Sequence, residues 1–261
     1  MGARGARARP DAAAADSEPA AAAKKRRVAG PPCAFLAQWL WKREAKSDKE
    51  RFDTPYCYPF EPAGEEPSTL VLEQRRFSAE GFASTVWDSA IVLSKFLELR
   101  GRGALTGKQC LELGSGCGLL STVLARLGAT VTSTDLECNL PLLRENLRAN
   151  CDQDVRVEPL MWAAETARSV RGDRVFDLVL ASDVMYLEEA VPALVGTLLA
   201  LCSMDTEVLI AHGRNRPAEK AFLTAVQRAG FSCHEVLVEQ LHPVYNCLDV
   251  SVLQLRLRSE S

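Results

Sequence analysis

The sequence of 261 residues has few of the features that mark metal-binding, disulfide-stabilised or membrane proteins. It has only three histidines, and its nine cysteines form no Cys-x-x-Cys pair, so the sequence predicts no metal site. The odd number of widely spaced cysteines is typical of reduced thiols, and we expect no disulfide framework. No apolar run is long enough to span a membrane, and the N-terminus has no apolar signal-peptide core. We therefore expect a soluble, cytoplasmic protein without a membrane partner.

Charge is distributed unevenly along the chain. Residues 1–30 contain seven Lys and Arg against three Asp and Glu, so the formal charge of −3 for the whole chain leaves −7 for the remainder. An acidic folded part differs from the broad basic faces that bind duplex nucleic acid, and we expect no stable nucleic-acid partner. Residues 1–32 are rich in Ala and Arg and have no aromatic residue, which predicts a disordered basic arm. Within it, Lys24–Val28 is either a nuclear import signal, which would add the nucleus as a location, or part of a solvated tail.

Beyond the arm, the hydrophobic pattern predicts strands and helices in alternation. Residues 33–100 form an N-terminal extension with a charged helix over 35–51, a strand over 69–74 and an amphipathic helix over 87–99. In residues 101–261 the expected strands cover 108–113, 129–134, 155–160, 175–181, 207–211, 231–239 and 248–256, and the expected helices cover 119–127, 140–150, 188–202 and 218–229. This alternation indicates right-handed crossovers and therefore a doubly wound α/β domain. Its sheet should be mostly parallel, with helices on both faces and a final antiparallel pair at one edge.

The sharpest motif follows the first strand of this domain and reads Glu112-Leu113-Gly114-Ser115-Gly116-Cys117-Gly118. Glycines at such a turn let the backbone approach a ligand, and the next helix directs its N–H groups at that ligand. Alone, the motif could be a tight turn without a ligand. However, Asp135 ends the second strand, where a carboxylate can accept both hydroxyls of a ribose. The two features together predict a nucleoside site.

The loop does not suit a phosphate-rich cofactor. Neither register of the glycines supplies the third glycine of a dinucleotide fingerprint, because Leu119 and Ser121 stand at those positions. A Walker sequence is also missing, because Lys108 is followed by Gln109. A carboxylate such as that of Glu112 would repel a phosphate but attract the cationic methionine end of S-adenosylmethionine. The sequence therefore predicts S-adenosylmethionine as the cofactor.

At these residues the chain resembles the seven-β-strand protein-lysine N-methyltransferases of the methyltransferase-like 21 type, which modify chaperones, translation elongation factors and AAA ATPases. The likeness runs from about residue 70 to residue 256. The stretches that carry it are Thr85–Ser94 with its Val-Trp-Asp segment, Glu112–Gly118, Thr134–Leu136, Met161–Trp162, and Ala181–Glu188 with an Asp-x-x-Tyr signature. The resemblance implies a Rossmann-like sheet of seven strands and methyl transfer to the ε-amine of a lysine in a protein substrate. One departure is Ala181-Ser182, where relatives often have Gly-Ala.

The resemblance also indicates the site residues. The expected cofactor-binding residues are Trp87, Glu112, Gly114, Ser115, Gly116, Gly118, Asp135, Leu136, Trp162 and Ser182. Asp183 and Tyr186 are the expected catalytic residues, since they follow a strand at the edge where open α/β sheets bind ligands. Asp183 would orient the amine by a hydrogen bond, and Tyr186 would wall the lysine channel. The alternative is that Asp183 caps the next helix and Tyr186 only packs.

Two other functions stay open at this point. A nucleic-acid base methyltransferase on the same fold usually has Pro-Pro between the acid and the aromatic residue, to stack the flipped base, and Val184-Met185 stands here. A non-catalytic adaptor would be expected to lose part of the loop, the ribose acid or the signature, and all three are intact. We expect a monomer that acts on a protein substrate.

Overall fold

The computed structural model of the chain describes residues 39–75, 83–214 and 218–258. The described residues belong to one compact unit. The predicted basic arm and its import run lie outside the described residues. The domain boundary predicted at residue 100 falls inside a helix, Asp88–Leu105 (α2), which is interrupted at Gly101 by a backbone φ of 71°.

Most of the described chain is helix or strand. The helices after α2 are α3 (Leu119–Arg126), α4 (Leu140–Asn150), α5 (Ala164–Arg171), α6 (Val191–Leu201) and α7 (Glu219–Arg228). The strands are β1 (Tyr56–Phe60), β2 (Ser68–Leu72), β3 (Gln109–Leu113), β4 (Thr130–Asp135), β5 (Arg156–Pro159), β6 (Leu178–Ser182), β7 (Glu207–Gly213), β8 (Phe231–Glu235) and β9 (Val250–Leu257). Short turns of 3-10 or π type are η1 (Arg43–Ala45), η2 (Lys49–Asp53), η3 (Glu137–Asn139), η4 (Glu188–Ala190) and η5 (Val238–Gln240).

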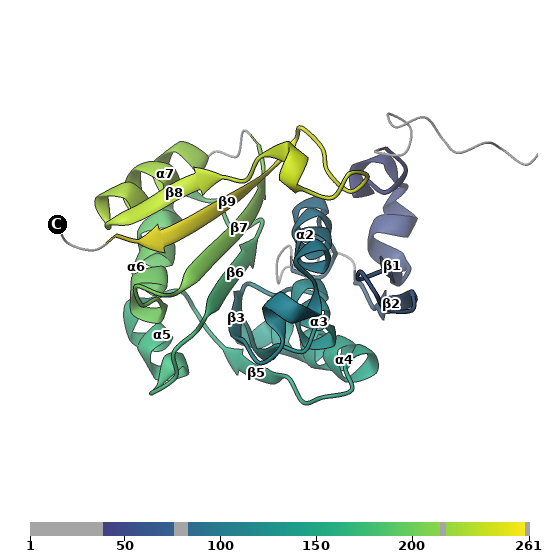
Figure 1. Cartoon of the computed structure of the whole chain (residues 1–261), viewed down its shortest axis with the longest axis horizontal. Helices are drawn as coiled ribbons and strands as arrows, with labels where there is room; N and C mark the ends of the chain where they lie inside the picture. Colours follow the sequence, from purple (N-terminus) through teal and green to yellow (C-terminus); the bar gives the residue numbers. More distant parts are fainter. Residues whose placement is uncertain (1–38, 76–82, 215–217, 259–261) are drawn as a thin grey trace, which may run out of the picture. The chain divides into compact units, whose positions relative to one another are not determined.

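Seven of the strands form one sheet in the order β5-β4-β3-β6-β7-β9-β8 (Figure 1). Neighbouring strands from β5 to β7 are parallel, whereas β9 is antiparallel to both β7 and β8. The predicted doubly wound sheet with an antiparallel final pair is therefore confirmed. The chain leaves β3 for β4 and β5 and then returns to β6 on the other side of β3. Open α/β sheets bind ligands at such a reversal, outside the carboxyl ends of the two strands.

Helices cover both faces of this sheet (Figure 1). Successive side chains of a strand point to opposite faces, so Cys110 belongs to the buried apolar cluster that includes α2 and α3, whereas Leu111 belongs to the cluster that includes α5, α6 and α7. Both side chains are fully buried. Each fully buried large aliphatic side chain contributes about 1.5–3 kcal/mol through the hydrophobic effect. The two apolar layers thus hold the sheet rigid and leave its carboxyl edge for a ligand.

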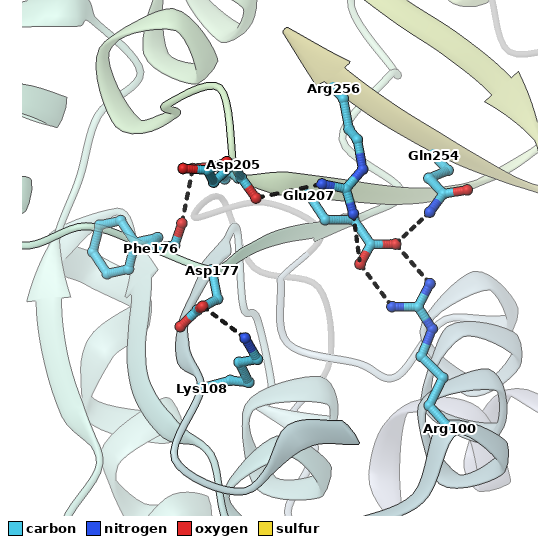
Figure 2. A network of polar contacts seen from close by, with 9 residues as sticks. Arg100, Lys108, Phe176, Asp177, Asp205, Glu207, Gln254 and Arg256 are labelled. Atoms are coloured by element: carbon cyan, nitrogen blue, oxygen red, sulfur yellow. Dashed lines mark hydrogen bonds and ion pairs between the residues drawn. The ribbon is translucent and has the colours of Figure 1, made fainter. Parts of the chain in front are cut away.

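The opposite, amino edge of the parallel strands is closed by charged side chains (Figure 2). Glu207 at the start of β7 accepts two bonds from Arg100, at 2.9 and 2.6 Å, and one from Gln254 at 2.6 Å. Lys108, before β3, pairs with Asp177, before β6, at 2.9 Å. A two-pronged Arg–carboxylate pair is both strong and directional. These contacts tie α2, β3, β6, β7 and β9 together at the edge away from the ligand crevice.

The N-terminal extension differs from the prediction at 35–51. In the described part of that range Trp39 and Leu40 are helical, but the chain then breaks and forms the two short turns η1 and η2, so a continuous helix over 35–51 was wrong. The backbone N–H of Arg43 donates to the Asp88 carboxylate at 2.7 Å, and the buried Lys42 pairs with Asp249. Two charged residues of this stretch, Lys42 and Arg43, are therefore buried and paired with other parts of the fold, although most of the others are exposed.

Two further elements were not predicted. The strand expected over 69–74 is β2, and its partner β1 contains Pro59, which weakens a strand signal because proline lacks an N–H. Helix α5 has only eight residues, and Ala167 and Val170 are its only buried side chains, so its apolar signal in the sequence is short. Both elements depend on tertiary packing that local sequence does not show.

Candidate active site

A pocket of about 700 Å³ opens at the carboxyl ends of β3, β4 and β6, where the strand order reverses. Eleven of the twelve predicted site residues line it: Trp87, Glu112, Gly114, Ser115, Gly116, Asp135, Leu136, Trp162, Ser182, Asp183 and Tyr186. Gly118 is the predicted site residue that is not part of the lining. Residues that were predicted from sequence, and that are up to about a hundred positions apart in the chain, therefore line one and the same cavity.

The glycine loop needs glycine for steric reasons. Gly114 and Gly116 have φ values of +66° and +53°, in the left-handed region that side chains other than glycine rarely adopt. A Cβ on Gly116 would lie 2.8 Å from the backbone oxygen of Ala83, and one on Gly114 would contact Trp162 at 3.9 Å. The loop thus presents bare backbone to the pocket.

Gly118 serves the packing of helices instead. It precedes α3 with a φ of +82°, and a Cβ there would lie 2.7 Å from Cδ1 of Leu143 in α4. Its backbone carbonyl also accepts a 2.7 Å bond from Thr122. The third glycine of the motif therefore lets α3 approach α4, which fixes the direction of the helix that starts at the loop.

Glu112 lines the pocket and is 1% exposed. Its carboxylate accepts hydrogen bonds from the backbone N–H, at 2.9 Å, and the hydroxyl of Ser121. Burial raises the pKa of Glu112 to about 7, although the bonds from Ser121 and Ser115 act in the opposite direction. A cationic ligand in the pocket would therefore stabilise the ionised form of Glu112, because a nearby positive charge favours the ionised form of a carboxyl group.

Asp135 ends β4 and is also nearly buried. The backbone N–H of Gly116 donates to Oδ2 at 2.7 Å, and the backbone N–H of Leu136 and the side-chain amide of Asn139 donate to Oδ1, each at 2.7 Å. The bond from Gly116 links the acid directly to the glycine loop. Its carboxylate is thus held at the pocket wall where a ribose would present its hydroxyls.

Aromatic and apolar side chains complete the cofactor half of the pocket. Trp87 immediately precedes α2, and Trp162, after β5, has its ring beside Gly114. Leu136, 46% exposed, follows β4, and Ser182 is the last residue of β6, and these two strands flank β3. Bare backbone, two acids and flanking indole rings fit a flat, positively charged nucleoside, so the residues present suit S-adenosylmethionine.

Asp183 has the one positive φ, +52°, among the described residues other than glycine. Its backbone N–H continues the pairing with β7 by a 2.9 Å bond to the Ala211 carbonyl. Its carboxylate accepts the Ser89 hydroxyl on one oxygen and the Gly213 backbone N–H, at 3.2 Å, on the other. Strained backbone of this kind persists where surrounding contacts impose it, and it is frequent at active sites.

The helix-cap alternative for Asp183 does not fit this geometry. The next helical turn, η4, begins after Leu187 and has no side-chain cap, and neither has α6. Tyr186 is 46% exposed at the pocket mouth, and both partial burial and the charge of Asp135 raise its pKa. Its phenol therefore lies within electrostatic reach of the cofactor half of the pocket.

The chain matches the model of a protein family described as lysine methyltransferase over residues 65–229. It belongs to this family. Protein N-lysine methyltransferase METTL21A of Danio rerio is 42% identical over 176 residues, which cover 64% of this chain and 79% of the relative. EEF1A lysine methyltransferase 3 of Mus musculus is 35% identical over 144 residues, covering 54% of this chain and 60% of the relative.

Among solved structures, the T. thermophilus 16S rRNA N2 G1207 methyltransferase RsmC, in complex with AdoMet and guanosine, shares the fold of this lysine methyltransferase. The TM-score is 0.54 at 20% identity, with 78% of this chain and 51% of that chain covered. The predicted Rossmann-like fold, S-adenosylmethionine as methyl donor and protein-lysine methyltransferase activity are confirmed. Substrate identity and the roles of individual residues stay predictions.

Sequence reasoning missed several polar residues that hold the predicted site of the methyltransferase. Ser89 bonds to Asp183, Ser121 to Glu112 and Asn139 to Asp135. Asn139 follows its acid by four residues, within one helical turn, which is a signal that could have been used. For Ser121 and Ser89 the sequence offers no comparable signal, because their partners are nine and 94 residues away.

The described residues can also be searched for metal sites, disulfides and membrane-spanning helices. Within these residues, no group of three or more His, Cys, Asp and Glu side chains is arranged to hold a metal ion. Their eight cysteines form no disulfide. None of their helices combines the length and apolar character needed to cross a membrane.

Proposed function

We propose that this methyltransferase modifies a lysine on a protein of the chaperone, elongation-factor or AAA ATPase class, and that Asp183 and Tyr186 contact the target amine. The names of two relatives support a protein lysine as the acceptor, and one of them is named for EEF1A. The folded part of the chain is acidic, which suits a positively charged lysine segment. We also propose that the enzyme acts as a monomer in the cytoplasm and in the nucleus.

The observation that carries the proposal is the position of the Asp183 carboxylate. It lines the same pocket as the glycine loop, and its backbone adopts an unfavourable φ. A carboxylate has about four acceptor positions, so it can hold Ser89 and the Gly213 N–H and still accept a bond from a lysine amine. The strain is consistent with an acid placed for a ligand.

The chemistry requires a neutral, well-oriented amine. S-adenosylmethionine, when bound, supplies an electrophilic methyl group attached to a sulfonium sulfur. Asp183 accepts an N–H of the amine and so fixes the direction of the nitrogen lone pair, and alignment of this kind is a large part of catalysis. A free lysine has a pKa of about 10.4, and desolvation in the pocket lowers this value and favours the neutral form.

In this proposal the cofactor is bound by the glycine loop together with Glu112 and Asp135. Glu112 would face the positive methionine end, and Asp135 would accept from the ribose hydroxyls. Trp87 and Trp162 would contact the adenosine, and the ring of Tyr186 would exclude water from the lysine channel. In this arrangement the two halves of the pocket meet at Asp183.

The test is methyl transfer by Asp183→Asn. Labelled S-adenosylmethionine is incubated with cell extract to identify the protein that accepts the label, and turnover is then measured on that protein. Asparagine tolerates a positive φ, so the backbone should keep its conformation while the charge is lost. We expect turnover to fall about 100-fold and the Kd for S-adenosylhomocysteine to stay within about threefold.

Asp177→Asn is the matched control. Asp177 lies just before β6, at the end away from the pocket, and its carboxylate also accepts a backbone N–H, that of Gln109 at 2.8 Å. This variant should keep wild-type turnover. Turnover of Asp183→Asn within about tenfold of wild type would refute the role of Asp183, and label in RNA instead of protein would refute the proposed substrate class.

A further inference from the structure

One wall of the cofactor pocket comes from a segment outside the seven-stranded sheet. Ala83, Thr85 and Val86 line the pocket together with Trp87. These residues lie between β2 and α2 and belong to neither element. The sheet therefore does not set their position, and other contacts must do so.

The segment lies very close to the glycine loop. The backbone oxygen of Ala83 is 2.8 Å from the point where a Cβ of Gly116 would be, and the Cys117 thiol lies 3.7 Å from the same oxygen. Contacts this short leave little space, so a small displacement of the segment would change the shape of the cofactor pocket. Binding of the cofactor thus depends on how the segment is held.

Gln74, two residues after β2, holds it. Its side chain is buried, and its amide oxygen accepts the backbone N–H of Val86 at 3.1 Å and the hydroxyl of Thr85 at 2.9 Å. Its amide nitrogen donates to the Thr54 carbonyl at 2.7 Å. Beside it, the Arg75 N–H donates to the Ser84 carbonyl at 2.9 Å. One glutamine side chain therefore fixes the backbone that leads into Trp87.

The buried guanidinium of Arg43 fixes Gln74 in turn. It donates to the Gln74 amide oxygen at 2.9 Å and to the Arg51 carbonyl at 2.7 Å. The Thr85 hydroxyl also lies 2.7 Å from that carbonyl. Hydrogen bonds from a charged donor are stronger than neutral ones. The extension before the sheet thus reaches the pocket wall through Arg43 and Gln74.

We propose that Gln74 is a positioning residue for the cofactor: it sets the distance between the Ala83–Trp87 segment and the glycine loop and so determines cofactor affinity. This inference rests on the cofactor role of the pocket. Gln74 itself does not line the pocket, so it acts through Thr85 and Val86. Its substitution should change cofactor binding without changing the affinity for the protein substrate.

The experiment is calorimetric titration of the full chain with S-adenosylhomocysteine at 25 °C, after circular dichroism has shown each variant to be folded. Gln74→Met keeps the length of the side chain but leaves the buried Val86 N–H without an acceptor. We expect its Kd to rise about tenfold, with a similar rise in the KM for S-adenosylmethionine and a KM for the protein substrate within about twofold of wild type. Gln74→Glu retains an acceptor for Val86 and Arg43 and should restore the Kd to within about threefold.

Asn150→Leu is the matched control, because Asn150 ties β2, the strand that precedes Gln74, to α4 by bonds of 2.9 and 2.8 Å with the backbone of Val71. It should lower stability but leave the Kd within about twofold. If Gln74→Met does not fold, Arg43→Lys provides the test, since it loosens Gln74 from outside the pocket and should raise the Kd about threefold.

An unchanged Kd in a folded Gln74→Met protein, or in folded Arg43→Lys where the first variant is lost, would overturn the inference. An equal loss in Asn150→Leu would also overturn it, because the effect would then be general destabilisation. Failure of the wild-type protein to bind S-adenosylhomocysteine would instead refute the cofactor role of the pocket. The two failures are therefore distinguishable.

Discussion

Replacement of Glu112 by glutamine should make the ligand-free protein more stable above pH 7 and at the same time weaken its binding of S-adenosylmethionine. Burial raises the pKa of Glu112 to about 7, from a usual value of 4.5. Between these two pH values the folded protein keeps a proton that the unfolded chain has lost. Stability falls with rising pH wherever the folded state binds more protons, so this residue makes the wild type lose stability from pH 4.5 to about pH 7.

The size of the effect follows from the difference between the two pKa values. At about 1.36 kcal/mol for each unit of pKa, this difference corresponds to about 3 kcal/mol of folding stability. The value is an upper limit, because the site can relax when the carboxyl group ionises. Glutamine is neutral at every pH and retains an oxygen that can accept the N–H and hydroxyl of Ser121. The variant should therefore gain up to about 3 kcal/mol over the wild type at pH 8 and much less at pH 5.

Cofactor binding should favour the wild type, although the stability of the ligand-free protein favours the Glu112→Gln variant. A cationic ligand favours the ionised carboxylate, and a hydrogen bond to a charged group is worth about 1.5–3 kcal/mol. Glu112→Gln should thus bind S-adenosylmethionine about ten- to a hundredfold more weakly at pH 8. Loss of stability in exchange for a charge that a ligand needs is a common compromise in active sites.

The assay is urea unfolding of both proteins at pH 5 and pH 8, with calorimetric titration of S-adenosylmethionine at pH 8. Glu207→Gln is a control of opposite sign: burial acts against the ionised form, but the bonds from Arg100 and Gln254 still lower the pKa of Glu207 (Figure 2). That variant should lose stability by nearly the same amount at pH 8 and pH 5, because an acid with a lowered pKa loses its contribution only as the pH falls below the usual value of 4.5. If the stability difference between Glu112→Gln and wild type is the same at both pH values, the reasoning about burial is refuted; unchanged affinity would refute the charge argument.

Two further substitutions test the rest of the pocket. Gly116→Ala places a Cβ 2.8 Å from the Ala83 oxygen at a φ of +53°, and it should raise the Kd for S-adenosylhomocysteine at least about tenfold by calorimetry. Ser89→Ala removes the hydroxyl that binds Asp183, and it should lower kcat about tenfold while that Kd stays unchanged in the same titration.

Each of these variants has a matched control. Gly196 lies in α6 with open space where a Cβ would be, so Gly196→Ala should leave the Kd unchanged and should not destabilise the fold. Ser94 lies in α2, as Ser89 does, and its buried hydroxyl has no partner among the described residues, so Ser94→Ala should keep wild-type kcat. A control that loses as much as its test variant would contradict the specific contact.

The part of the site that could be predicted from sequence is the part in which position along a strand determines position in space. Glu112 is the next-to-last residue of β3 and Asp135 is the last residue of β4, and the carboxyl ends of such neighbouring parallel strands meet at one edge of the sheet. Asp183 follows β6, which pairs with β3 on the other side. An alternating pattern of strands and helices therefore brings the loop, the ribose acid and the Asp-x-x-Tyr signature to one crevice before any contact is known.

The residues that hold these groups could not be predicted, because side-chain contacts and not strand order place them. Ser89 and Asp183 are 94 positions apart, and Gln74 reaches Val86 from outside the sheet. Arg43 belongs to a charged stretch that is typical of a solvated helix, and it is buried only because Gln74 and backbone carbonyls accept its N–H groups. Composition alone does not show whether a charged residue has such partners.

The two pocket acids show how far residue type determines role. Both were predicted to face the ligand, and both line the pocket. Yet Asp135 accepts the Gly116 N–H at 2.7 Å, so it also shapes the glycine loop, whereas Glu112 is bound to Ser121 beneath that loop at a cost to folding above pH 7. A charge needed only for structure would be expected to stabilise the fold. Ionised Glu112 destabilises the fold instead. We therefore explain the presence of a carboxyl group at this position by the cationic ligand that the pocket binds.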